Sequence, residues 1–491
     1  MTDTNLSKSQ YIKGRQCMKR LWLSKHRAEL GDDLDLSKFV EGNEVGLLAR
    51  ECYPGGVLVK ETVIENAALE TLSYVQENQD VIFEAAAVNR EDGAYARIDV
   101  LKKHESGQGW DLVEVKSSTE AKEEHIEDVA FQYHAFKGAG YEIKRCYLMY
   151  IDNSYVRGEA LEPSKLFKLE NITEEAIREQ SIVEPRVPHF ITFLERPEQP
   201  KQDIGALCSK PYDCEFKTSC WKHVPKYSIF NVFTKAKAEE VYRLTQDYDV
   251  KSLSQDLYPE GNKLVDVESY IKGKNHIDKN QIREFLSKIT YPIYYLDYET
   301  MNSAVPLYEG TRPYQQVPFQ YSLHVEDKEG GSSVSHHEYI HQETSDPRRA
   351  LAESLVENCG ESGTVVAYNA SFEQRVNKDL AEAFPDLAEA LFSINDRMVD
   401  LMVPFRDRMI YSPEQKGSYS IKYVLPAFVP ELSYEGMDIA SGGEAMEQYK
   451  QFAKGNIVDQ KQQEQLWGAL SKYCELDTYA MVKLMHVLIG L

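Results

Sequence analysis

The alternation of hydrophobic and polar residues in the first third of the chain predicts two strands, a helix and a third strand. Residues 94–100 have the period of two that is typical of a half-buried strand. A Gly-containing turn at 106–109 leads into a second strand over 111–116, as in a hairpin. Apolar residues recur at helical spacing over 126–136, and 145–151 is apolar enough for another strand.

The second half of the chain begins with a change in character. Residues 291–300 form an apolar, aromatic run that is long enough for a buried strand. Residues 364–368 predict a short buried strand, and a helix that contains 374–380 follows it. The last helix is predicted over 467–488. Between the halves, 222–290 has mixed charge and few strand signals, which indicates a mostly helical connector.

Length and composition bound the class of protein. The 491 residues are 42% hydrophobic and 27% charged, which suits a soluble multidomain protein with two or three cores. We predict a first domain over 1–222, a connector over 223–289 and a last domain over 290–491. The chain shows no run of about 18 apolar residues and no signal-peptide pattern, so we expect neither a membrane partner nor secretion. Because there are only eight cysteines, we expect a cytoplasmic protein in which clustered thiolates hold metal.

The net charge of −23 would exclude a nucleic-acid partner only if it were spread evenly. It is not, because residues 11–27 carry six Lys and Arg side chains and no acidic one. This segment could contact backbone phosphates, or it could be the solvated face of an amphipathic helix. The sequence alone leaves both interpretations open.

The predicted hairpin carries residue types that suit phosphodiester hydrolysis. This reaction needs a metal that generates hydroxide and stabilises charge on the phosphate, and acidic side chains at the ends of adjacent strands can hold such a metal. Asp99 and Glu114 meet that need, and the backbone carbonyl of Val115 could complete the coordination. Lys116 lies on the same strand face as Glu114, where it could orient the water or neutralise the transition state.

Residues 10–222 resemble the RecB-like branch of the PD-(D/E)XK nucleases, which contains AddB and the CRISPR-associated iron–sulfur nucleases. The matching elements are, in chain order, Tyr11 to Cys17, Asp99, Glu114-Val-Lys116, Gln132 and the late cysteines ahead of Trp221. The resemblance implies a restriction-endonuclease-like α/β fold. It also implies that Asp99 and Glu114 hold the metal and that Gln132 supports the site.

Two departures from this family matter. The relatives carry a metal-binding His soon after the first cysteine motif, whereas 41–46 has none, so that Glu41 or Glu44 could replace it. The relatives' late cysteines are often spaced C-x2-C-x5-C, whereas this chain has C-x5-C-x5-C. The first departure puts one metal ligand in doubt.

Cysteines bracket the first domain at both ends, and four of them are candidate ligands: Cys17, Cys208, Cys214 and Cys220. Soft thiolates favour zinc or iron–sulfur clusters. Zinc ligands usually come in pairs about two to four residues apart, which these gaps exceed, so we favour a [4Fe–4S] cluster that staples the ends of the domain together. Ordinary buried thiols are the alternative. The remaining cysteines are interpreted as structural: Cys52, Cys146, Cys359 and Cys474.

The last domain carries a second set of acidic residues. Asp297 and Glu299 share one face of the aromatic strand. The turn after the strand at 364–368 delivers Glu373 to a strand edge. Tyr473 and Asp477 are four residues apart and therefore lie on one face of the final helix. These four carboxylates and the phenol can converge.

Residues 290–491 resemble the DnaQ-like, DEDD exonucleases in their tyrosine-bearing form. The matching motifs are Asp297-x-Glu299, Asn369-x-x-Phe-Glu373 and Tyr473-x3-Asp477. The resemblance implies an RNase H-like mixed sheet and two Mg²⁺ or Mn²⁺ ions held by the four carboxylates. It assigns to Tyr473 the orientation of the attacking water. The family's second motif normally supplies Asp, so Glu373 is a departure, and Asp400 could assist it.

A loop beside the first carboxylates is rich in Pro, aromatic and amide side chains. In 306–318, Tyr308 and Tyr314 could stack on bases and Arg312 could contact a phosphate, as in single-strand binders. A rigid structural loop is an equally good interpretation.

The two domains in this order look like an uncharacterised bacterial family in which a RecB-like iron–sulfur domain precedes a DnaQ-like domain. We therefore expect a metal-dependent DNA nuclease of repair, recombination or defence, whose last domain degrades single strands or free ends from the 3′ side. One alternative is an RNA-processing exonuclease with a degenerate first domain. Another is a non-catalytic scaffold that binds nucleic acid and whose carboxylates hold structural ions.

Overall fold

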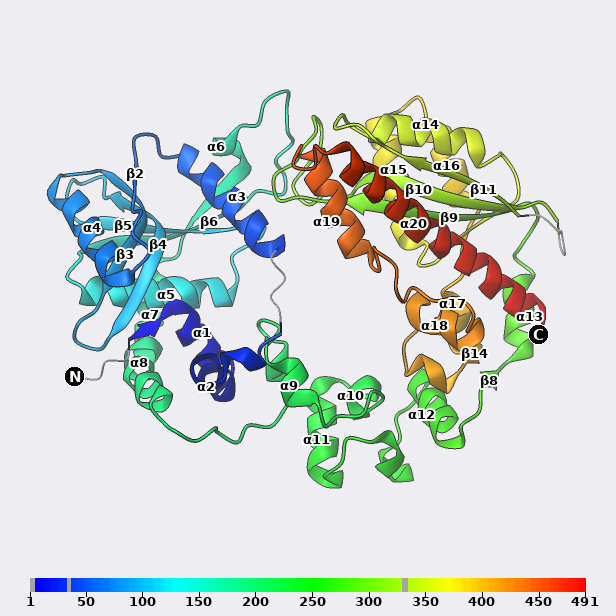
Figure 1. Ribbon diagram of the computed structural model, residues 1–491, viewed down its shortest axis with the longest axis horizontal. Helices are drawn as coiled ribbons and strands as arrows, with labels where there is room; N and C mark the ends of the chain where they lie inside the picture. Colours follow the sequence, from blue (N-terminus) through cyan, green and yellow to red (C-terminus); the bar gives the residue numbers. More distant parts are fainter. Residues whose placement is uncertain (1–4, 33–36, 329–333) are drawn as a thin grey trace. The chain divides into compact units, whose positions relative to one another are not determined.

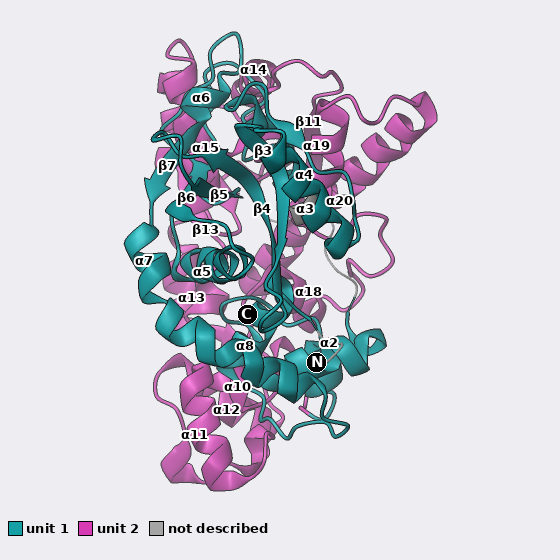
Figure 2. Cartoon of the chain, turned by 90° about the vertical axis from the view of Figure 1, so that its left-hand side faces the viewer, with its two compact units in different colours: residues 1–223, 303–314 teal, residues 224–302, 315–491 magenta. Residues whose placement is uncertain are grey.

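The computed structural model describes residues 5–32, 37–328 and 334–491 (Figure 1). The chain forms two compact units (Figure 2). Unit 1 comprises Met1–His223 and Ser303–Tyr314, and unit 2 comprises Val224–Asn302 and Gln315–Leu491. The predicted connector therefore belongs to unit 2, and a twelve-residue segment from within the predicted last domain belongs to unit 1. Each unit is built on its own mixed sheet, so the chain is an α/β protein.

Unit 1 contains a seven-stranded sheet with the order β2-β3-β4-β5-β6-β7, in which β1 also pairs with β4. The strands are β1 (Leu6–Ser7), β2 (Val57–Leu58), β3 (Val81–Val88), β4 (Ala94–Lys103), β5 (Trp110–Lys116), β6 (Ile143–Ile151) and β7 (Phe167–Asn171). The β3–β4, β4–β5 and β6–β7 pairs are antiparallel, and β5–β6 is parallel. The predicted hairpin, helix and third strand are confirmed as β4, β5, α5 and β6.

Helices cover both faces of this sheet. They are α1 (Lys8–Gln16), α2 (Met18–His26), α3 (Ser37–Glu51), α4 (Ile64–Gln76), α5 (Glu123–Gly138), α6 (Pro163–Leu166), α7 (Thr173–Arg178), α8 (Gln180–Leu194) and α9 (Lys217–Trp221). The main core lies between the sheet and α1, α5 and α8, where the ring of Tyr11 contacts those of Phe131 and Phe190. Ala49 of α3 packs with Phe83 in a smaller core.

Unit 2 contains a five-stranded sheet with the order β11-β10-β9-β12-β13. The strands are β9 (Ile293–Met301), β10 (Val317–Glu326), β11 (Val334–Ile340), β12 (Thr364–Ala367) and β13 (Met398–Asp400). The β9–β12 and β12–β13 pairs are parallel, whereas β10 runs antiparallel to both of its neighbours. A separate two-stranded sheet pairs β8 (His276–Ile277) with β14 (Ile410–Tyr411).

The helices of unit 2 fall into an early group and a group around the sheet. The early helices are α10 (Ile229–Val232), α11 (Lys235–Thr245), α12 (Asn262–Lys272) and α13 (Lys279–Leu286). The others are α14 (Arg348–Asn358), α15 (Ser371–Ala383), α16 (Ala388–Asp396), α17 (Val403–Arg406), α18 (Ile421–Phe428), α19 (Gly442–Ala453) and α20 (Gln460–Ile489). Helices α14, α15 and α16 pack on one face of the sheet, and α20 contacts β9 and β10 (Figure 1).

The alternation of side chains along β9 decides which residues face α20. Tyr294, Leu296 and Tyr298 point into the core with α14, α15 and α16. Since successive side chains of a strand point to opposite faces, Asp297 and Glu299 lie on the other face, the one that α20 crosses.

The segment Ser303–Tyr314 packs within unit 1. Tyr308 is buried, and the hydroxyl of Tyr314 donates a hydrogen bond to the backbone carbonyl of Ser117. The guanidinium of Arg157 donates to a carbonyl of the segment at 2.9 Å. These contacts support the rigid structural loop over a loop that stacks on bases.

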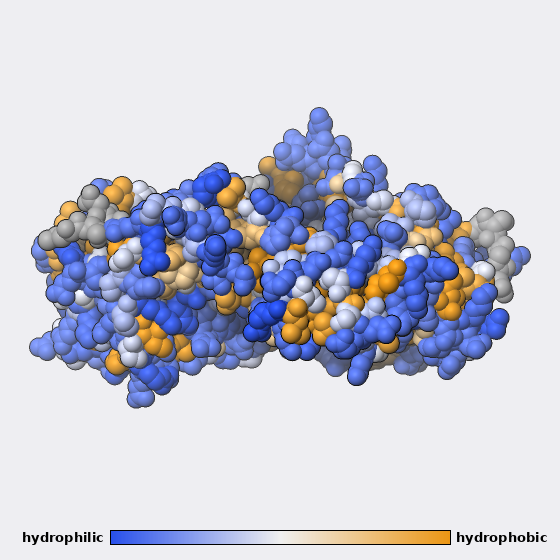
Figure 3. Space-filling view, turned by 90° about the horizontal axis from the view of Figure 1, so that it is seen from below, coloured by the Kyte–Doolittle hydropathy of each residue, from blue (hydrophilic) through white to orange (hydrophobic). Residues whose placement is uncertain are grey.

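Apolar side chains on the face drawn in Figure 3 occur in small, separate patches within a mostly hydrophilic surface. None of the described helices combines the length and the apolar character that a bilayer span requires.

Replacement of Asp266 is expected to destabilise unit 2. The Asp266 carboxylate and the Arg408 guanidinium are 0% and 3% exposed and form a bidentate ion pair, with Nη2 of Arg408 2.9 Å from Oδ2 of Asp266. Asp266→Ala leaves the guanidinium buried without its counter-charge, so the free energy of unfolding should fall by about 3–5 kcal/mol. Urea titration monitored by hydrogen exchange of unit 2 peptides measures this. The exposed Asp256→Ala is the control, and equal midpoints for both variants would refute the expectation.

Candidate active sites

One cavity of unit 2 collects the acidic residues of the predicted exonuclease motifs. Asp297 and Glu299 come from β9, Glu373 from the first turn of α15, and Tyr473 and Asp477 from α20. All five line the same cavity, which has a volume of about 420 Å³. The packing of β9 between α15 and α20 therefore brings together residues that are up to 180 positions apart in the chain (297 to 477).

Burial and mutual repulsion shift the pKa values of these carboxyls upward. Burial, followed by the charges of Asp477 and Glu299, raises the pKa of Asp297 well above its ordinary value. Burial raises the pKa of Glu299 to about 8 and that of Glu373 to about 8. Burial also raises the pKa of Asp477 to about 6. Such a cluster is stable in its ionised form only beside a compensating positive charge.

The donor set fits a divalent cation. Asp297, Glu299 and Cys474 each offer a ligand atom, and these atoms lie within 4.8 Å of one another. Oε2 of Glu373 is buried and has no hydrogen-bond partner among the described atoms. Carboxylate oxygens are the ligands that Mg²⁺ and Mn²⁺ prefer, so an unpartnered, buried carboxylate oxygen at this cavity is what a metal site requires.

Three residues of this site were not predicted as part of it. Tyr434 donates a hydrogen bond from its hydroxyl to Oδ1 of Asp477. The Lys422 ammonium lies 5.6 Å and 5.7 Å from the ring centres of Tyr434 and Tyr473. Sγ of Cys474 lies 3.7 Å from Oδ2 of Asp297, although the sequence indicated only a structural role for this cysteine. Its position directly after Tyr473 was the one available signal.

Asp400 lies near this site but is engaged with the backbone. Its Oδ1 accepts hydrogen bonds from the N–H groups of Asn369 at 3.0 Å and Met402 at 2.9 Å. Asn369 has φ +77°, and the bond to Asp400 helps to hold this left-handed turn two residues before α15. The charge of Asp400 contributes to the raised pKa of Glu373. Asp400 therefore orients the turn that carries Glu373.

The candidate site of unit 1 lies on β4, β5 and α5. Oδ2 of Asp99 accepts the backbone N–H of Val115 at 2.6 Å. Nε2 of Gln132 donates to Oε2 of Glu114 at 2.5 Å and to the carbonyl of Arg97 at 2.8 Å. The antiparallel pairing of β4 with β5 and the packing of α5 against the sheet thus bring Asp99, Glu114 and Gln132 together.

Two lysines surround Glu114. Nζ of Lys116 lies 2.9 Å from Oε1 of Glu114 and 2.6 Å from Oδ2 of Asp128. Nζ of Lys8, in α1, lies 2.7 Å from the same oxygen of Glu114. Burial alone would raise the pKa of Glu114, but the charges of Lys116 and Lys8 hold it well below its usual range. Burial and the Glu114 charge raise the pKa of Asp99 to about 8.

Lys8 and Asp128 belong to no recognisable sequence motif, so the sequence did not predict them as part of this site. Another unpredicted carboxylate, Glu84, lies opposite Asp99 in the β3–β4 pairing, because Phe83 pairs with Val100 and Ala85 with Ile98. Oε1 of Glu84 is 2.8 Å from Nη2 of Arg50.

Glu41 and Glu44 were considered as replacements for the metal-binding histidine of the RecB-like relatives. Oε1 of Glu41 accepts the backbone N–H of Ala304 at 3.1 Å, and Glu44 is half-buried. Glu84, like Glu114, is a carboxylate whose charge raises the pKa of Asp99.

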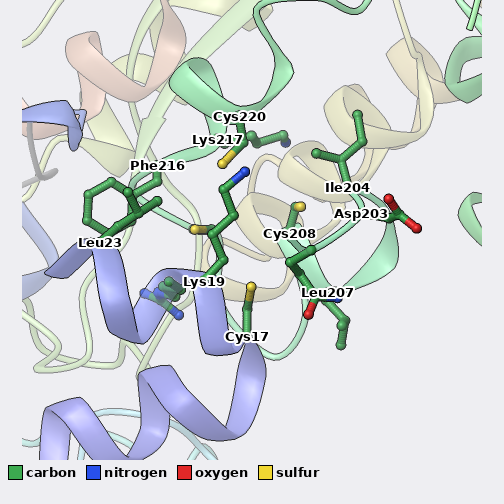
Figure 4. Close-up of a pocket in the computed structure, with 13 residues that line it drawn as sticks. Cys17, Lys19, Leu23, Asp203, Ile204, Leu207, Cys208, Phe216, Lys217 and Cys220 are labelled. Carbon is green, nitrogen blue, oxygen red and sulfur yellow. The ribbon is translucent and has the colours of Figure 1, made fainter. Parts of the chain in front are cut away.

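The four bracketing cysteines line one pocket of unit 1. In Figure 4 the sulfurs of Cys17, Cys208 and Cys220 point toward its interior. Burial raises the pKa of the Cys17 thiol, and the charges of Cys208 and Cys220 add to this effect. Burial raises the pKa of Cys214 to about 11. Four thiols gathered in this way are a donor set for zinc or an iron–sulfur cluster.

Side-chain contacts tie the early helices to the cysteine-bearing segment. Nε2 of Gln16 donates to the carbonyls of Leu207 at 2.6 Å and Tyr212 at 2.7 Å. Glu215 forms ion pairs with Lys13 at 2.8 Å and Arg20 at 2.7 Å. The ends of unit 1 are therefore held together beside the pocket.

The basic segment over 11–27 is largely engaged within unit 1. Besides the two residues paired with Glu215, Arg15 pairs with Glu127 and Arg27 with Glu29. Four of the six basic side chains of the segment therefore have an acidic partner.

The comparisons with known proteins found relatives for which no activity is described. A family described as a domain of unknown function (DUF2779) matches residues 294–420. Uncharacterized protein UU173 of Ureaplasma parvum serovar 3 is 25% identical over 42% of this chain and 34% of its own length. Uncharacterized protein MG366 of Mycoplasma genitalium is 23% identical over 45% of this chain and 35% of its own length. The aligned part spans about a third of each relative, and the carboxylate motif on β9 lies inside the family match.

Proposed function

We propose that unit 2 is a metal-dependent 3′–5′ exonuclease of the DnaQ-like type that acts on single-stranded DNA or free DNA ends. The observation that carries this proposal is the convergence of Asp297, Glu299, Glu373, Asp477 and Tyr473 on one cavity. The strand order β11-β10-β9-β12-β13 with only β10 antiparallel supports an RNase H-like sheet. The carboxylates on its central strand, β9, suit the two-metal site of such an exonuclease.

The residues of this cavity have different roles in the proposed hydrolysis. Asp297, Glu299, Glu373 and Asp477 would hold Mg²⁺ or Mn²⁺, which supplies a nucleophilic hydroxide and offsets charge on the phosphate. Tyr473 orients the attacking water from α20. Tyr434 fixes Asp477 through its hydroxyl, and the charge of the Lys422 ammonium offsets part of the rise in pKa that burial causes at Glu299 and Asp477.

Mn²⁺ affinity should strengthen as the pH rises from about 6 to about 8. The pKa values of Asp477, about 6, and of Glu299 and Glu373, about 8, mean that protons compete with the metal across this range. As these protons leave, affinity should rise about tenfold per pH unit while one carboxyl titrates. Calorimetric titration of the full chain, with the Asp297→Ala signal subtracted, measures it. A Kd that stays constant over this range would contradict the expectation.

We propose further that unit 1 is a PD-(D/E)XK nuclease whose metal is held by Asp99 and Glu114. The contacts of Glu114 with Gln132 and Lys116 support this proposal. Glu84 is a candidate for the further carboxylate ligand, since it lies opposite Asp99. For the pocket of Cys17, Cys208, Cys214 and Cys220 we propose a [4Fe–4S] cluster, which would staple the two ends of the unit.

Lys116→Ala should lower the nuclease activity of unit 1 about 100-fold or more. The Lys116 ammonium touches Glu114 and is placed to stabilise charge in the transition state, an effect worth about 3 kcal/mol. The rate is measured on end-labelled DNA with Mg²⁺ or Mn²⁺ in the Asp297→Ala background, so that unit 2 is silent. Lys102→Ala, an exposed position on β4, is the control.

The outcomes of that assay separate the alternatives. If Lys116→Ala and Lys102→Ala digest DNA equally, unit 1 does not cut. A preference for RNA ends over DNA ends, compared over a range of salt, would indicate an RNA-processing exonuclease. Should the wild-type chain degrade neither, the non-catalytic scaffold gains support.

A further inference from the structure

A groove opens beside the carboxylate cavity of unit 2, and we propose that it binds the unpaired nucleotides that lead to the scissile end. This tyrosine groove has a volume of about 1100 Å³, and Tyr419, Tyr423, Lys226 and Lys416 line it. Tyr368, Asn369 and Ile421 line both the groove and the carboxylate cavity. The two spaces therefore lie side by side. The inference rests on the proposed exonuclease function and adds the path of the substrate strand.

Two tyrosines of the groove expose their rings. Tyr419 is 42% exposed and Tyr423 is 48% exposed, so both side chains are accessible to a ligand. Proteins that hold single strands without sequence preference stack bases on exposed aromatic rings. Stacking of this kind requires an unpaired base, so the groove suits a single strand.

The charge of the groove is opposite to that of the chain. Lys226 and Lys416 line it, and no Asp or Glu is among its described lining residues, although the chain carries a net charge of −23. Neither lysine forms an ion pair with a described residue, and Lys226 is exposed. A groove that presents two ammonium groups and no carboxylate favours the binding of a polyanion, even in an acidic protein.

The backbone of the groove is held in place before any ligand binds. The turn at Lys416 and Gly417 has positive φ at both residues, +50° and +77°. The Gly417 carbonyl accepts bonds from Arg408 at 3.1 Å and Lys263 at 3.2 Å. The Gly417 N–H donates to the hydroxyl of Tyr411 at 2.9 Å. A preformed groove binds its ligand at a lower entropic cost than a mobile loop.

The same segment reaches the catalytic residues. Between Ile421 and Tyr423, Lys422 points to the rings of Tyr434 and Tyr473 and donates to the carbonyl of Ala440 at 2.6 Å. Tyr423 directly follows Lys422 in the chain, and Tyr419 precedes Lys422 by three residues. The lining residues that the groove shares with the cavity favour a nucleic-acid strand that ends in the cavity over an unrelated ligand.

Binding tests the tyrosines directly. The full chain with Lys116→Ala, which silences unit 1, is titrated with a labelled oligo(dT) of about 15 nucleotides in EDTA, and anisotropy gives the Kd. Tyr419→Ala with Tyr423→Ala should raise the Kd at least about tenfold, because stacking of each base contributes about that much. Phe392→Ala, which removes a 44% exposed aromatic ring on α16, should leave the Kd unchanged. Equal Kd values for the two variants would overturn the proposal.

Salt dependence tests the lysines. Removal of both Lys226 and Lys416 should lower the slope of log Kd against log salt by about 0.7 for each lysine. Lys378→Ala on α15, with a 63% exposed side chain, should not change the slope. Oligo(rU) in a parallel titration tells whether the groove distinguishes RNA from DNA. An unchanged slope for the double lysine variant would contradict the proposed phosphate contacts.

Hydrolysis of a short and a long substrate distinguishes an error in the groove proposal from an error in the exonuclease proposal. The nitrophenyl ester of thymidine monophosphate is a substrate that reaches only the proposed metal site, because it carries a single nucleotide and no strand to extend along the groove. The ratio of oligo(dT) to ester hydrolysis should fall about tenfold or more in the double tyrosine variant relative to Phe392→Ala. If the wild type hydrolyses neither substrate, the exonuclease proposal fails, while the EDTA titration still decides whether the groove binds a strand.

Discussion

Asp297→Ala is expected to abolish 3′–5′ degradation of single-stranded DNA by unit 2, with a loss of about a thousandfold or more in rate. Asp297 lies at the centre of the carboxylate group, and the charges of Asp477, Glu299 and Glu373 act on it. A metal supplies several kcal/mol of transition-state stabilisation, and about 4 kcal/mol corresponds to a thousandfold. The measurement is digestion of 5′-labelled single strands with Mg²⁺ or Mn²⁺ by the full chain with Lys116→Ala.

The control for this variant is Asp396→Ala, which removes an exposed carboxylate from α16. It should digest at the wild-type rate. Asp297→Ala should retain its fold, because removal of one carboxyl relieves repulsion among the buried acids, and circular dichroism checks this. Retention of most of the activity in Asp297→Ala would show that this cavity does not carry the hydrolysis.

Cys220→Ala is expected to unfold unit 1 and to release the iron of the proposed cluster. Cys220 shares a pocket with Cys17, Cys208 and Cys214, and these residues come from opposite ends of the unit. Where a metal centre joins distant segments, the free energy of metal binding is part of the free energy of folding, on the order of 10 kcal/mol for structural sites. The variant should be colourless, contain less than one iron per chain and become sensitive to protease within unit 1.

The matched control is Cys52→Ala, since Cys52 is half-buried and lies outside the pocket. It should keep the iron content and the visible absorption of the wild type. A wild-type protein that binds one zinc and no iron would instead indicate a mononuclear site. If Cys220→Ala and Cys52→Ala are equally resistant to protease, the pocket does not staple the unit.

The strands were the part of the fold that the sequence predicted best. Alternation along 94–100 and the aromatic run at 291–300 are local patterns, and they became β4 and β9. The placement of Asp297 and Glu299 on one face followed from the same period of two. The gathering of Glu373 and Asp477 at that face depends on helix packing, and only the order of the motifs along the chain indicated it.

The residues that the sequence did not predict are single polar side chains whose partners are distant in the chain. Lys8 meets Glu114 across 106 positions, and Tyr434 meets Asp477 across 43. No periodicity marks such a residue, because its partner is chosen by the packing of α1 on the sheet or of the segment before α19 on α20. The tyrosine groove has the same origin, since Lys226 and Lys416 come from separate segments.

The return of Ser303–Tyr314 to unit 1 limits how the protein can be divided. Ala304 and Val305 pack with Val45, Ile151 and Tyr155 in a core of unit 1. A fragment that stops at residue 223 lacks this strap, so its truncated core would be wetted and prone to aggregate. Excision of unit 2 with the strap still attached would carry the same apolar residues into solvent. To produce unit 1 alone, Ser303–Tyr314 must therefore be fused to a fragment that ends at residue 223.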